Sequence, residues 1–297
     1  MVTLLYFILF IVSILLVSIQ PWWLMYQYSN LMAFILHRVV RYRVGVTRGN
    51  LMRAFPEKSA EELKKLEDGV YKNLADITVE TLKGFTMRNS KVVKRHKIIN
   101  PELLYKYYQN RQNIIGVTGH INNWEWGAMS AGLQLKHHPV AIYKPLKNQL
   151  IDWFMKLNRS IRGTTLVPTK ETFETFKRLQ NERCIFLLVA DQSPSKTAKA
   201  RWATFFNQET ACIHGPENYA KMYNYPVLYI DIRRVKRGFY EVEFSLLAET
   251  PIQLKDGDLT QLYMHKLEEV IRKNPENWLW THRRWKKKKP ASEQTAP

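Results

Sequence analysis

The heptapeptide from Gly119 to Glu125 (GHINNWE) carries residues suited to proton transfer. It follows an apolar run, 113–118, that is typical of a buried strand, and ligands of α/β sheets bind beyond the carboxyl ends of strands. His120 can take a proton near neutral pH, and a loop that folds Glu125 back against it would orient the ring. The pattern predicts a His120/Glu125 dyad acting as general base, with a plain loop or core histidine as the alternative.

No recognised nucleophile or metal motif accompanies this pair. The sequence has no Gly-x-Ser-x-Gly, and Cys184 and Cys212 lie in no recognisable catalytic setting. It has no His-Glu-x-x-His, and His137 and His138 lack further ligands at a usual spacing. We therefore expect no metal, no cofactor and no covalent acyl-enzyme. The dyad would instead deprotonate a hydroxyl or amine of the substrate, which attacks an activated acyl group directly.

The elements that must position His120 follow an α/β pattern. Short apolar runs predict buried strands, helical stretches separate them, and a late pair predicts an antiparallel hairpin. We therefore predict an α/β fold with a mixed, mostly parallel sheet flanked by helices. The predicted strands are 113–118, 140–143, 165–167 and 184–190, with the hairpin at 227–233 and 240–247. The predicted helices are 59–84 (Ser59 and Glu62 forming a capping box), 124–133, 146–161 (Leu150, Ile151, Phe154 and Leu157 sharing one face), 171–179 and 259–272.

The first nineteen residues carry no charged side chain. As a helix they would extend for about 28 Å, which matches the hydrocarbon core of a bilayer. No basic residue precedes them and no small-residue cleavage site follows, which argues against a signal peptide. We predict a membrane anchor and interfacial segment at 1–45, an α/β acyltransferase domain at 46–290 and a frayed tail at 291–297. A buried core helix is the alternative for 1–19, and full span and half-insertion both remain open.

The formal net charge is +19, from 45 Lys and Arg against 26 Asp and Glu. The excess is concentrated in four clusters, and no charged residue precedes Arg38. Cationic patches indicate anionic partners, and the apolar N-terminus favours a lipid surface, with the first arginines on the cytoplasmic side. The clusters are Arg38, Arg41, Arg43, Arg48 and Arg53; Lys91, Lys94, Arg95 and Lys97; Arg233, Arg234, Lys236 and Arg237; and Arg283, Arg284 and 286–289.

At these residues the sequence resembles the bacterial lipid A late acyltransferases of the lauroyl and myristoyl type. That family carries a His-x4-Asp/Glu motif, commonly within G-H-x-G-N-W-E, which here has Asn122 in place of the second glycine. Asparagine tolerates a left-handed backbone, so the departure is mild. Three further blocks match in order, at 158–163 (NRSIRG), 190–192 (ADQ) and 278–286 (WLWTHRRWK). The ordered set spans nearly the whole chain and is far more specific than His-x4-Glu alone.

The resemblance implies a glycerolipid-acyltransferase-like fold and a membrane-bound enzyme at the cytoplasmic face of the inner membrane. It implies an acyl-carrier-protein thioester as acyl donor and a phosphorylated lipid A precursor as acceptor. The choice of a carrier protein over coenzyme A rests on the resemblance alone. In the implied site, His120 is the general base and Glu125 is its orienting partner. Arg159 binds an oxyanion or phosphate, with Arg162 as the second candidate for this role. The resemblance further implies that the site is organised by Asp191, Gln192 and Asn123, and that the acceptor site is lined, or the membrane faced, by His282, Arg283 and Arg284.

Less specific interpretations of these residues and of the whole chain stay open at this point. Arg159 and Arg162 would also suit a solvated helix end, and Asp191 would also suit the cap of a turn. The last cationic cluster, from Arg283 to 289, would also suit a basic surface tail that faces lipid. An acyltransferase for another lysolipid, glycerolipid or aminolipid shares the histidine chemistry, but the glycerolipid relative carries Glu-Gly-Thr where this chain has 191–194 (DQSP). A basic membrane scaffold or nucleic-acid-binding protein is the alternative of another class, although no recognised nucleic-acid module occurs.

Overall fold

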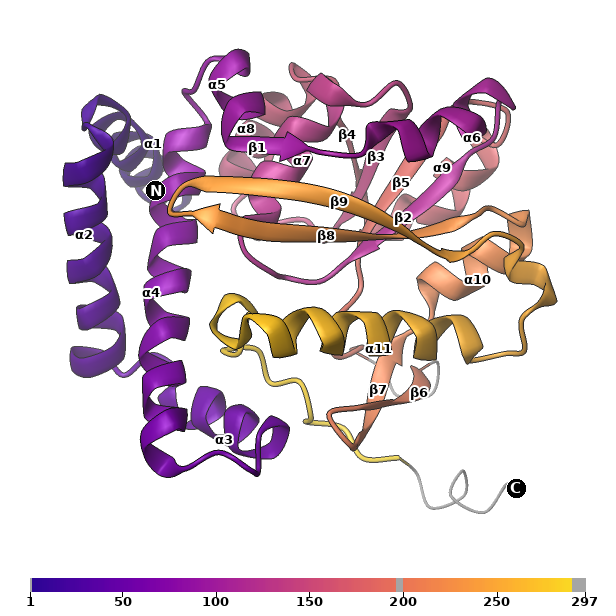
Figure 1. Ribbon diagram of the computed structural model, residues 1–297. Helices are drawn as coiled ribbons and strands as arrows, with labels where there is room; N and C mark the ends of the chain where they lie inside the picture. The colour runs from indigo at the N-terminus through magenta and orange to yellow at the C-terminus, as the bar shows by residue number, and fades with distance from the viewer. Residues whose placement is uncertain (1, 196–199, 290–297) are drawn as a thin grey trace.

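A seven-stranded sheet forms the centre of the computed structural model, which describes residues 2–195 and 200–289 (Figure 1). The strand order is β1-β9-β8-β2-β5-β3-β4, and all neighbouring pairs are parallel except β8 and β9. The predicted mixed, mostly parallel sheet is therefore confirmed. Its strands are β1 (His96–Ile98), β2 (Ile114–Thr118), β3 (His138–Tyr143), β4 (Thr165–Pro168), β5 (Cys184–Val189), β8 (Val227–Lys236) and β9 (Phe239–Ala248).

Both faces of this sheet are buried, which explains why its strands appear in the sequence as continuous apolar runs. Successive residues alternate between two hydrophobic cores: Ile114 and Leu228 point into one, and Ile115 and Tyr229 into the other. The first core is covered by α5 (Asn89–Arg95), α6 (Tyr105–Gln109) and α7 (Trp124–Gln134). The second is covered by α9 (Thr172–Arg178), α10 (Gly215–Tyr223) and α11 (Asp258–Lys273).

The N-terminal helices form a separate layer at one edge of the sheet (Figure 1). The long α4 (Ala60–Gly84) begins at the predicted capping box, with the Glu62 N–H donating to the Ser59 hydroxyl at 3.3 Å and the Ser59 N–H donating to the Glu62 carboxylate at 2.8 Å. It packs against the other helices of this layer. They are α1 (Val2–Ile19), α2 (Trp22–Phe34), a π-helical turn, η1 (Ile35–Val39), and α3 (Val44–Ala54).

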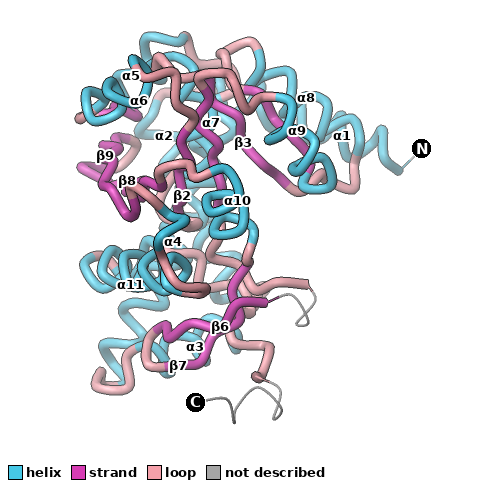
Figure 2. Tube along the Cα trace, turned by 90° about the vertical axis from the view of Figure 1, so that its right-hand side faces the viewer, coloured by secondary structure: helices cyan, strands magenta, loops and turns pink. Residues whose placement is uncertain are grey.

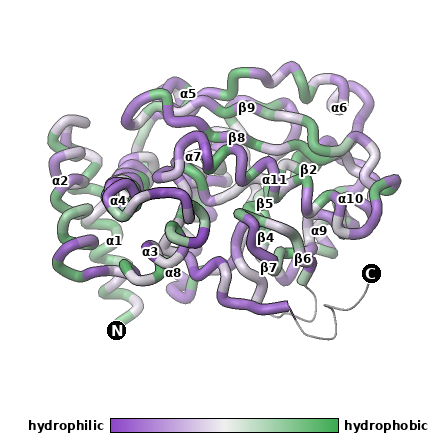
Figure 3. The backbone as a smooth tube through the Cα atoms, turned by 60° about the horizontal axis from the view of Figure 1, so that its bottom comes forward, coloured by the Kyte–Doolittle hydropathy of each residue, from purple (hydrophilic) through white to green (hydrophobic). Residues whose placement is uncertain are grey.

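Among the described residues, α1 is the one helix that is long and apolar enough to cross a membrane. Only Ile14 of α1 is buried, and Figure 3 shows the helix at the outer edge of the molecule. The alternative of a buried core helix therefore does not describe α1.

Several elements were not expected from the sequence. β6 (Ala200–Phe205) and β7 (Gln208–Ile213) form a separate antiparallel hairpin whose charged and polar residues mask its alternation. The short β1 and helices α3, α5 and α10 were also missed. The predicted tail at 291–297 lies outside the described residues. The remaining helices are α8 (Gln149–Ser160) and the 3-10 turns η2 (Pro101–Leu104), η3 (Thr169–Glu171), η4 (Pro251–Gln253) and η5 (Pro275–Asn277).

Candidate active site

The parallel register of β2 and β5 brings two strand ends together. Thr118 lies opposite Val189, and His120 and Asp191 each follow two residues later. The Asp191 carboxylate accepts a hydrogen bond from the His120 main-chain N–H at 2.7 Å and pairs with the ring Nδ1 at 2.5 Å. His120 therefore has a buried carboxylate that fixes the orientation of its ring.

The expected contact between Glu125 and the His120 ring is not formed, so this part of the prediction is wrong. Helix α7 begins at Trp124, and its path directs Glu125 toward α8, where its Oε2 pairs with Nη2 of Arg159. The other Glu125 oxygen accepts a hydrogen bond from the Trp124 indole at 3.1 Å. The second ring nitrogen of His120, Nε2, lies 3.2 Å from the side-chain nitrogen of Gln192.

The charges of this site favour a histidine that binds a proton readily. Burial alone would lower the pKa of His120, but the charge and hydrogen bond of Asp191 outweigh it, with a smaller contribution from Glu125, and the pKa is raised. Burial alone would raise the pKa of Asp191, but His120 and the hydrogen bonds to the carboxylate hold it at about 2. Because Asp191 stays ionised, Nδ1 keeps its proton and the lone pair lies on Nε2, where the Gln192 amide donates to it.

The C-terminal segment that contains Trp278 and Leu279 contacts both the loop of His120 and the carboxylate of Asp191. The Trp278 indole donates to Oδ2 of Asp191 at 2.7 Å, and Trp278 forms a β-bridge with Ile121. The main-chain N–H of Leu279 donates to the His120 carbonyl at 3.1 Å. The sequence marked this segment by its match to the family signature, but gave no sign that Trp278 binds the carboxylate.

Gly119 and Asn122 suit the close packing and the backbone conformation of the loop around His120. A Cβ on Gly119 would lie 2.7 Å from Cδ1 of Leu267 and 3.2 Å from Oδ2 of Asp191, so a side chain there would push against the carboxylate. Asn122 has a φ of 49°, in the left-handed region that asparagine tolerates. The left-handed backbone at Asn122 agrees with the expectation from the sequence.

A fully buried glutamate, which the sequence did not single out, fixes the start of α7. The Asn123 side chain caps the helix by accepting from the Trp126 N–H at 3.0 Å and donates to Oε2 of Glu80 at 2.8 Å. Glu80 also accepts hydrogen bonds from Tyr240 at 2.7 Å and Tyr26 at 3.0 Å. The α7 N-terminus, which carries Glu125, is therefore tied to α4, β9 and α2.

A family model described as bacterial lipid A biosynthesis acyltransferase matches residues 1–287. The chain belongs to this family. It is 23% identical over 250 residues to a lipid A biosynthesis lauroyltransferase of Escherichia coli (strain K12), which covers 84% of this chain and 81% of the relative. It is 23% identical over 248 residues to a lipid A biosynthesis palmitoleoyltransferase of the same organism, and this alignment covers 83% of this chain and 80% of the relative. It is 24% identical over 255 residues to a lipid A biosynthesis acyltransferase of Haemophilus influenzae, with 84% of this chain and 79% of the relative covered. The predicted family and enzyme class, an acyltransferase, are confirmed.

Two arginines that the sequence assigned to the lipid A acyltransferase site are engaged elsewhere. Arg162 is 5% exposed and donates to the main-chain carbonyls of Asn158 and Met87 at 3.0 and 3.1 Å, so its guanidinium holds a helix end in place. Arg284 is 1% exposed and donates to the Ala211 carbonyl at 2.6 Å. Arg284 therefore neither faces the membrane nor lines an acceptor site.

The neighbours of Arg284 in the family signature differ from it. Arg283 is exposed. His282 accepts a hydrogen bond from the Ser193 N–H at 3.1 Å, and burial lowers its pKa to about 4. A neutral His282 therefore supports the segment that follows Gln192, and only Arg283 of the three points freely to solvent.

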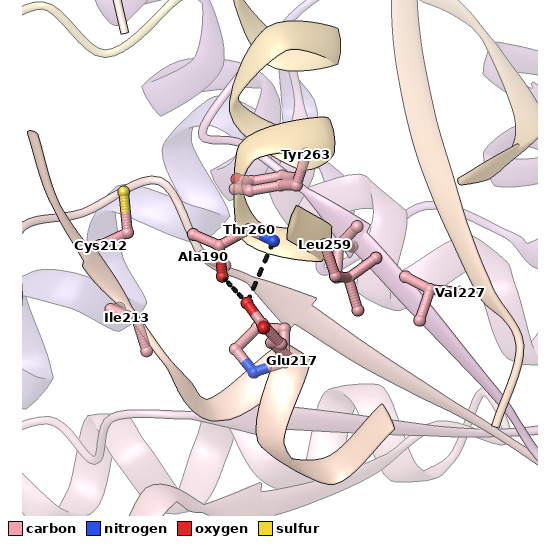
Figure 4. Close-up of a pocket in the computed structure, with 10 residues that line it drawn as sticks. Ala190, Cys212, Ile213, Glu217, Val227, Leu259, Thr260 and Tyr263 are labelled. Atoms are coloured by element: carbon pink, nitrogen blue, oxygen red, sulfur yellow. Dashed lines mark hydrogen bonds between the residues drawn. The ribbon is translucent and has the colours of Figure 1, made fainter. Parts of the chain in front are cut away.

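A small cavity of the acyltransferase lies between α10 and α11, next to β2 and β8 (Figure 4). Its volume is about 10 Å³, close to the minimum for one water molecule. The Glu217 carboxylate beside it accepts from the main-chain N–H groups of Thr260 at 3.2 Å and Gly257 at 2.6 Å. This cavity is too small for an acyl chain and its charge is satisfied, so it belongs to the core.

Proposed function

We propose that this acyltransferase transfers a fatty acyl chain from an acyl-carrier-protein thioester to a hydroxyl of a lipid A precursor, at the cytoplasmic face of the inner membrane. The observation that carries the proposal is the His120–Asp191 pair at the ends of β2 and β5, in a chain of the lipid A acyltransferase family. The proposal includes the division of the chain into a membrane segment (1–45) and a catalytic domain (46–290).

His120 acts as the general base through Nε2. The acceptor hydroxyl takes the place of the Gln192 amide and gives its proton to Nε2 while its oxygen attacks the thioester carbonyl carbon. Asp191, bonded to Nδ1, stabilises the imidazolium that forms. The tetrahedral intermediate then expels the thiolate as the C–S bond breaks, and the thiolate takes the proton back from the imidazolium. No acyl-enzyme forms on this route.

Neither cysteine is suited to carry the acyl group instead. Cys184 and Cys212 are free and buried. Burial raises the pKa of the Cys184 thiol to about 11, and it also raises the pKa of Cys212. A buried thiol that resists ionisation is a poor nucleophile, which supports direct transfer.

Arg159 stabilises negative charge near His120. It is 7% exposed and pairs with Glu125, while its Nε, also buried, has no hydrogen-bond partner in the described structure. A guanidinium held in this way can hydrogen-bond an oxyanion or a phosphate of the acceptor with its remaining N–H groups. Glu125 sets the position of that guanidinium, and thereby acts on the reaction through Arg159.

The test uses the purified full-length enzyme with acyl-carrier-protein and coenzyme A thioesters and a lipid A precursor in anionic vesicles. We expect mass spectrometry to show the acceptor heavier by one acyl chain with the carrier-protein donor, and no product from His120→Ala at an unchanged melting temperature. Normal turnover by His120→Ala would overturn the role of the base. Preferential acylation of a lysoglycerolipid or aminolipid would support the related enzyme class instead.

A further inference from the structure

Helix α8 exposes a row of apolar side chains and buries polar side chains on its opposite side, where Phe154 and Met155 also pack inward. Trp153 is 56% and Leu157 44% exposed, although Leu157 was among the residues predicted to form the apolar face of this helix. Asp152 is 8% and Arg159 7% exposed on the opposite face, where Asp152 accepts from the Tyr143 hydroxyl at 2.8 Å. A surface helix in water normally buries its apolar side chains, so this exposed apolar row indicates an apolar environment outside α8. The exposed apolar set is Leu146, Leu150, Trp153, Leu157 and Ile161.

This face continues directly into α1. Figures 2 and 3 both draw α1 beside α8. The Asn148 side chain donates to the Thr3 carbonyl at 2.9 Å, and further along both helices the rings of Phe10 and Phe154 meet edge to face at 5.6 Å. The two helices therefore run side by side in the same direction, and lipid that covers the outer side of α1 also reaches α8.

The far end of α1 is also fixed to the domain. The Lys83 ammonium donates to the carbonyls of Val17 and Ser18 at 3.2 and 3.0 Å, and the hydroxyls of Ser18 and Thr86 lie 2.6 Å apart. Contacts at both ends keep α1 against the catalytic domain. A membrane that holds α1 in this position must meet the neighbouring surface as well.

We propose that the outward face of α8 is a second membrane contact, seated in the bilayer beside α1. The proposal rests on the membrane location given under the proposed function and deepens it. Because Arg159 projects from the opposite side of the same helix, this seating holds the Arg159–Glu125 pair one helix away from the lipid.

Site-specific labelling of the full chain tests the proposal. Trp153→Cys, Leu9→Cys and Met222→Cys each place one exposed cysteine, on α8, on α1 and on the distant α10, at positions that are 56%, 52% and 59% exposed. The native cysteines are buried, and unlabelled wild type measures any background. Each variant carries an environment-sensitive fluorophore and is bound to phosphatidylethanolamine–phosphatidylglycerol vesicles that contain lipids with a quencher on the acyl chain. We expect quenching at positions 9 and 153 and none at 222.

The other outcomes contradict the proposal in distinguishable ways. Quenching at position 9 alone would leave the anchor in place and overturn the contact by α8. No quenching anywhere would overturn the membrane location itself, and equal quenching at 222 would indicate nonspecific adsorption. A blue shift at 153 that grows with protein concentration and ignores the lipid quencher would assign the face to a second copy of the chain.

A functional comparison adds an independent result. Trp153→Glu places a charge on the outward face, and Met222→Glu does the same at a matched exposed position on α10. With the acceptor in vesicles, we expect Trp153→Glu to lower kcat/KM at least about tenfold and Met222→Glu to leave it unchanged, with the same melting temperature for both. Equal kcat/KM values for the two variants would overturn the proposal.

Discussion

Asp191 binds His120 at two points, the main-chain N–H and the ring Nδ1, with a different carboxylate oxygen for each. The Trp278 indole shares the oxygen that accepts from the main chain. The carboxylate is 2% exposed, so its charge is poorly screened by water and acts strongly on the ring. One side chain thus fixes the orientation, the tautomer and the proton affinity of the proposed base.

Replacing Asp191 by Asn removes that charge with little change in shape. Without it, Nδ1 no longer has a carboxylate to hold its proton, and we expect kcat to fall about 10³-fold or more. The pKa of His120 should also fall, because Asp191 is what raises it above its ordinary value. In wild type, activity decreases as the pH falls through this raised pKa; in Asp191→Asn the remaining activity should decrease at a lower pH. The measurement is kcat against pH at saturating donor.

A folding defect is separated from this effect by the melting temperature and by the pH profile. Loss of folded protein lowers the amplitude of the profile without moving it to lower pH. If Asp191→Asn kept the wild-type profile, the assignment of Asp191 as the partner of His120 would fail.

Glu125 and Arg159 should behave as one unit in mutant kinetics. Glu125→Gln leaves Arg159 without its ion pair, and Arg159→Gln removes the guanidinium itself; we expect each to lower kcat/KM about 10²-fold. Since both changes disable the same group, the double variant should be little worse than either single variant. The measurement is a double-mutant cycle in kcat/KM. Additive losses would indicate that Glu125 acts independently of Arg159.

The pH profile of Glu125→Gln distinguishes the two carboxylates. Glu125 contributes less than Asp191 to raising the pKa of His120, so the profile should move less than in Asp191→Asn. An equal or larger displacement would return Glu125 to the role that the sequence first suggested for it.

The sequence singled out His120 but not the carboxylate that pairs with its ring, for a reason that lies in the sheet. The apolar runs at 113–118 and 184–190 predicted both strands, and the residues after them were correctly expected at the strand ends. Strand order and register are set by long-range packing, and it is the pairing of Thr118 with Val189 that brings His120 and Asp191 together. Short sequence separation favoured Glu125, whereas 71 residues separate His120 from Asp191.

The orientation of side chains was equally inaccessible from local patterns. The helical spacing of α8 predicted one buried apolar face, but the buried partners of Asp152 and Arg159 turn Leu150 and Leu157 outward, and of that face Phe154 packs inward. Arg234 and Arg237, from one predicted cationic cluster, turn toward Asp76 of α4. Composition gives the amount of charge, and only the fold determines how much of it reaches the surface.

Glu80→Gln tests whether the start of α7 must be held for catalysis. The carboxylate accepts three hydrogen bonds from side chains in a fully buried site, and an amide nitrogen in place of one oxygen cannot accept. We expect a loss of about 1–3 kcal/mol in the free energy of unfolding, measured by urea denaturation. Because Asn123 loses its anchor, kcat of the remaining folded enzyme should also fall. Thr78→Ala on the exposed side of the same helix is the control, and a similar effect there would contradict a specific role for Glu80.

Arg283 and Arg284 are adjacent, yet their environments predict opposite results. Arg284→Ala removes the donor to the Ala211 carbonyl and leaves a gap in the core beside Phe205, so we expect a loss of about 2–4 kcal/mol in the free energy of unfolding, with little change in kcat of the folded fraction.

Arg283 is exposed, so Arg283→Ala should leave the melting temperature unchanged. If Arg283 contacts the acceptor or the lipid surface, its loss should raise KM for the vesicle-bound acceptor and weaken the dependence of KM on salt, because one cationic contact is gone. Measuring the melting temperature and KM for both variants separates the two roles; a rise in KM for Arg284→Ala at unchanged stability would show that this buried arginine reaches the substrate after all.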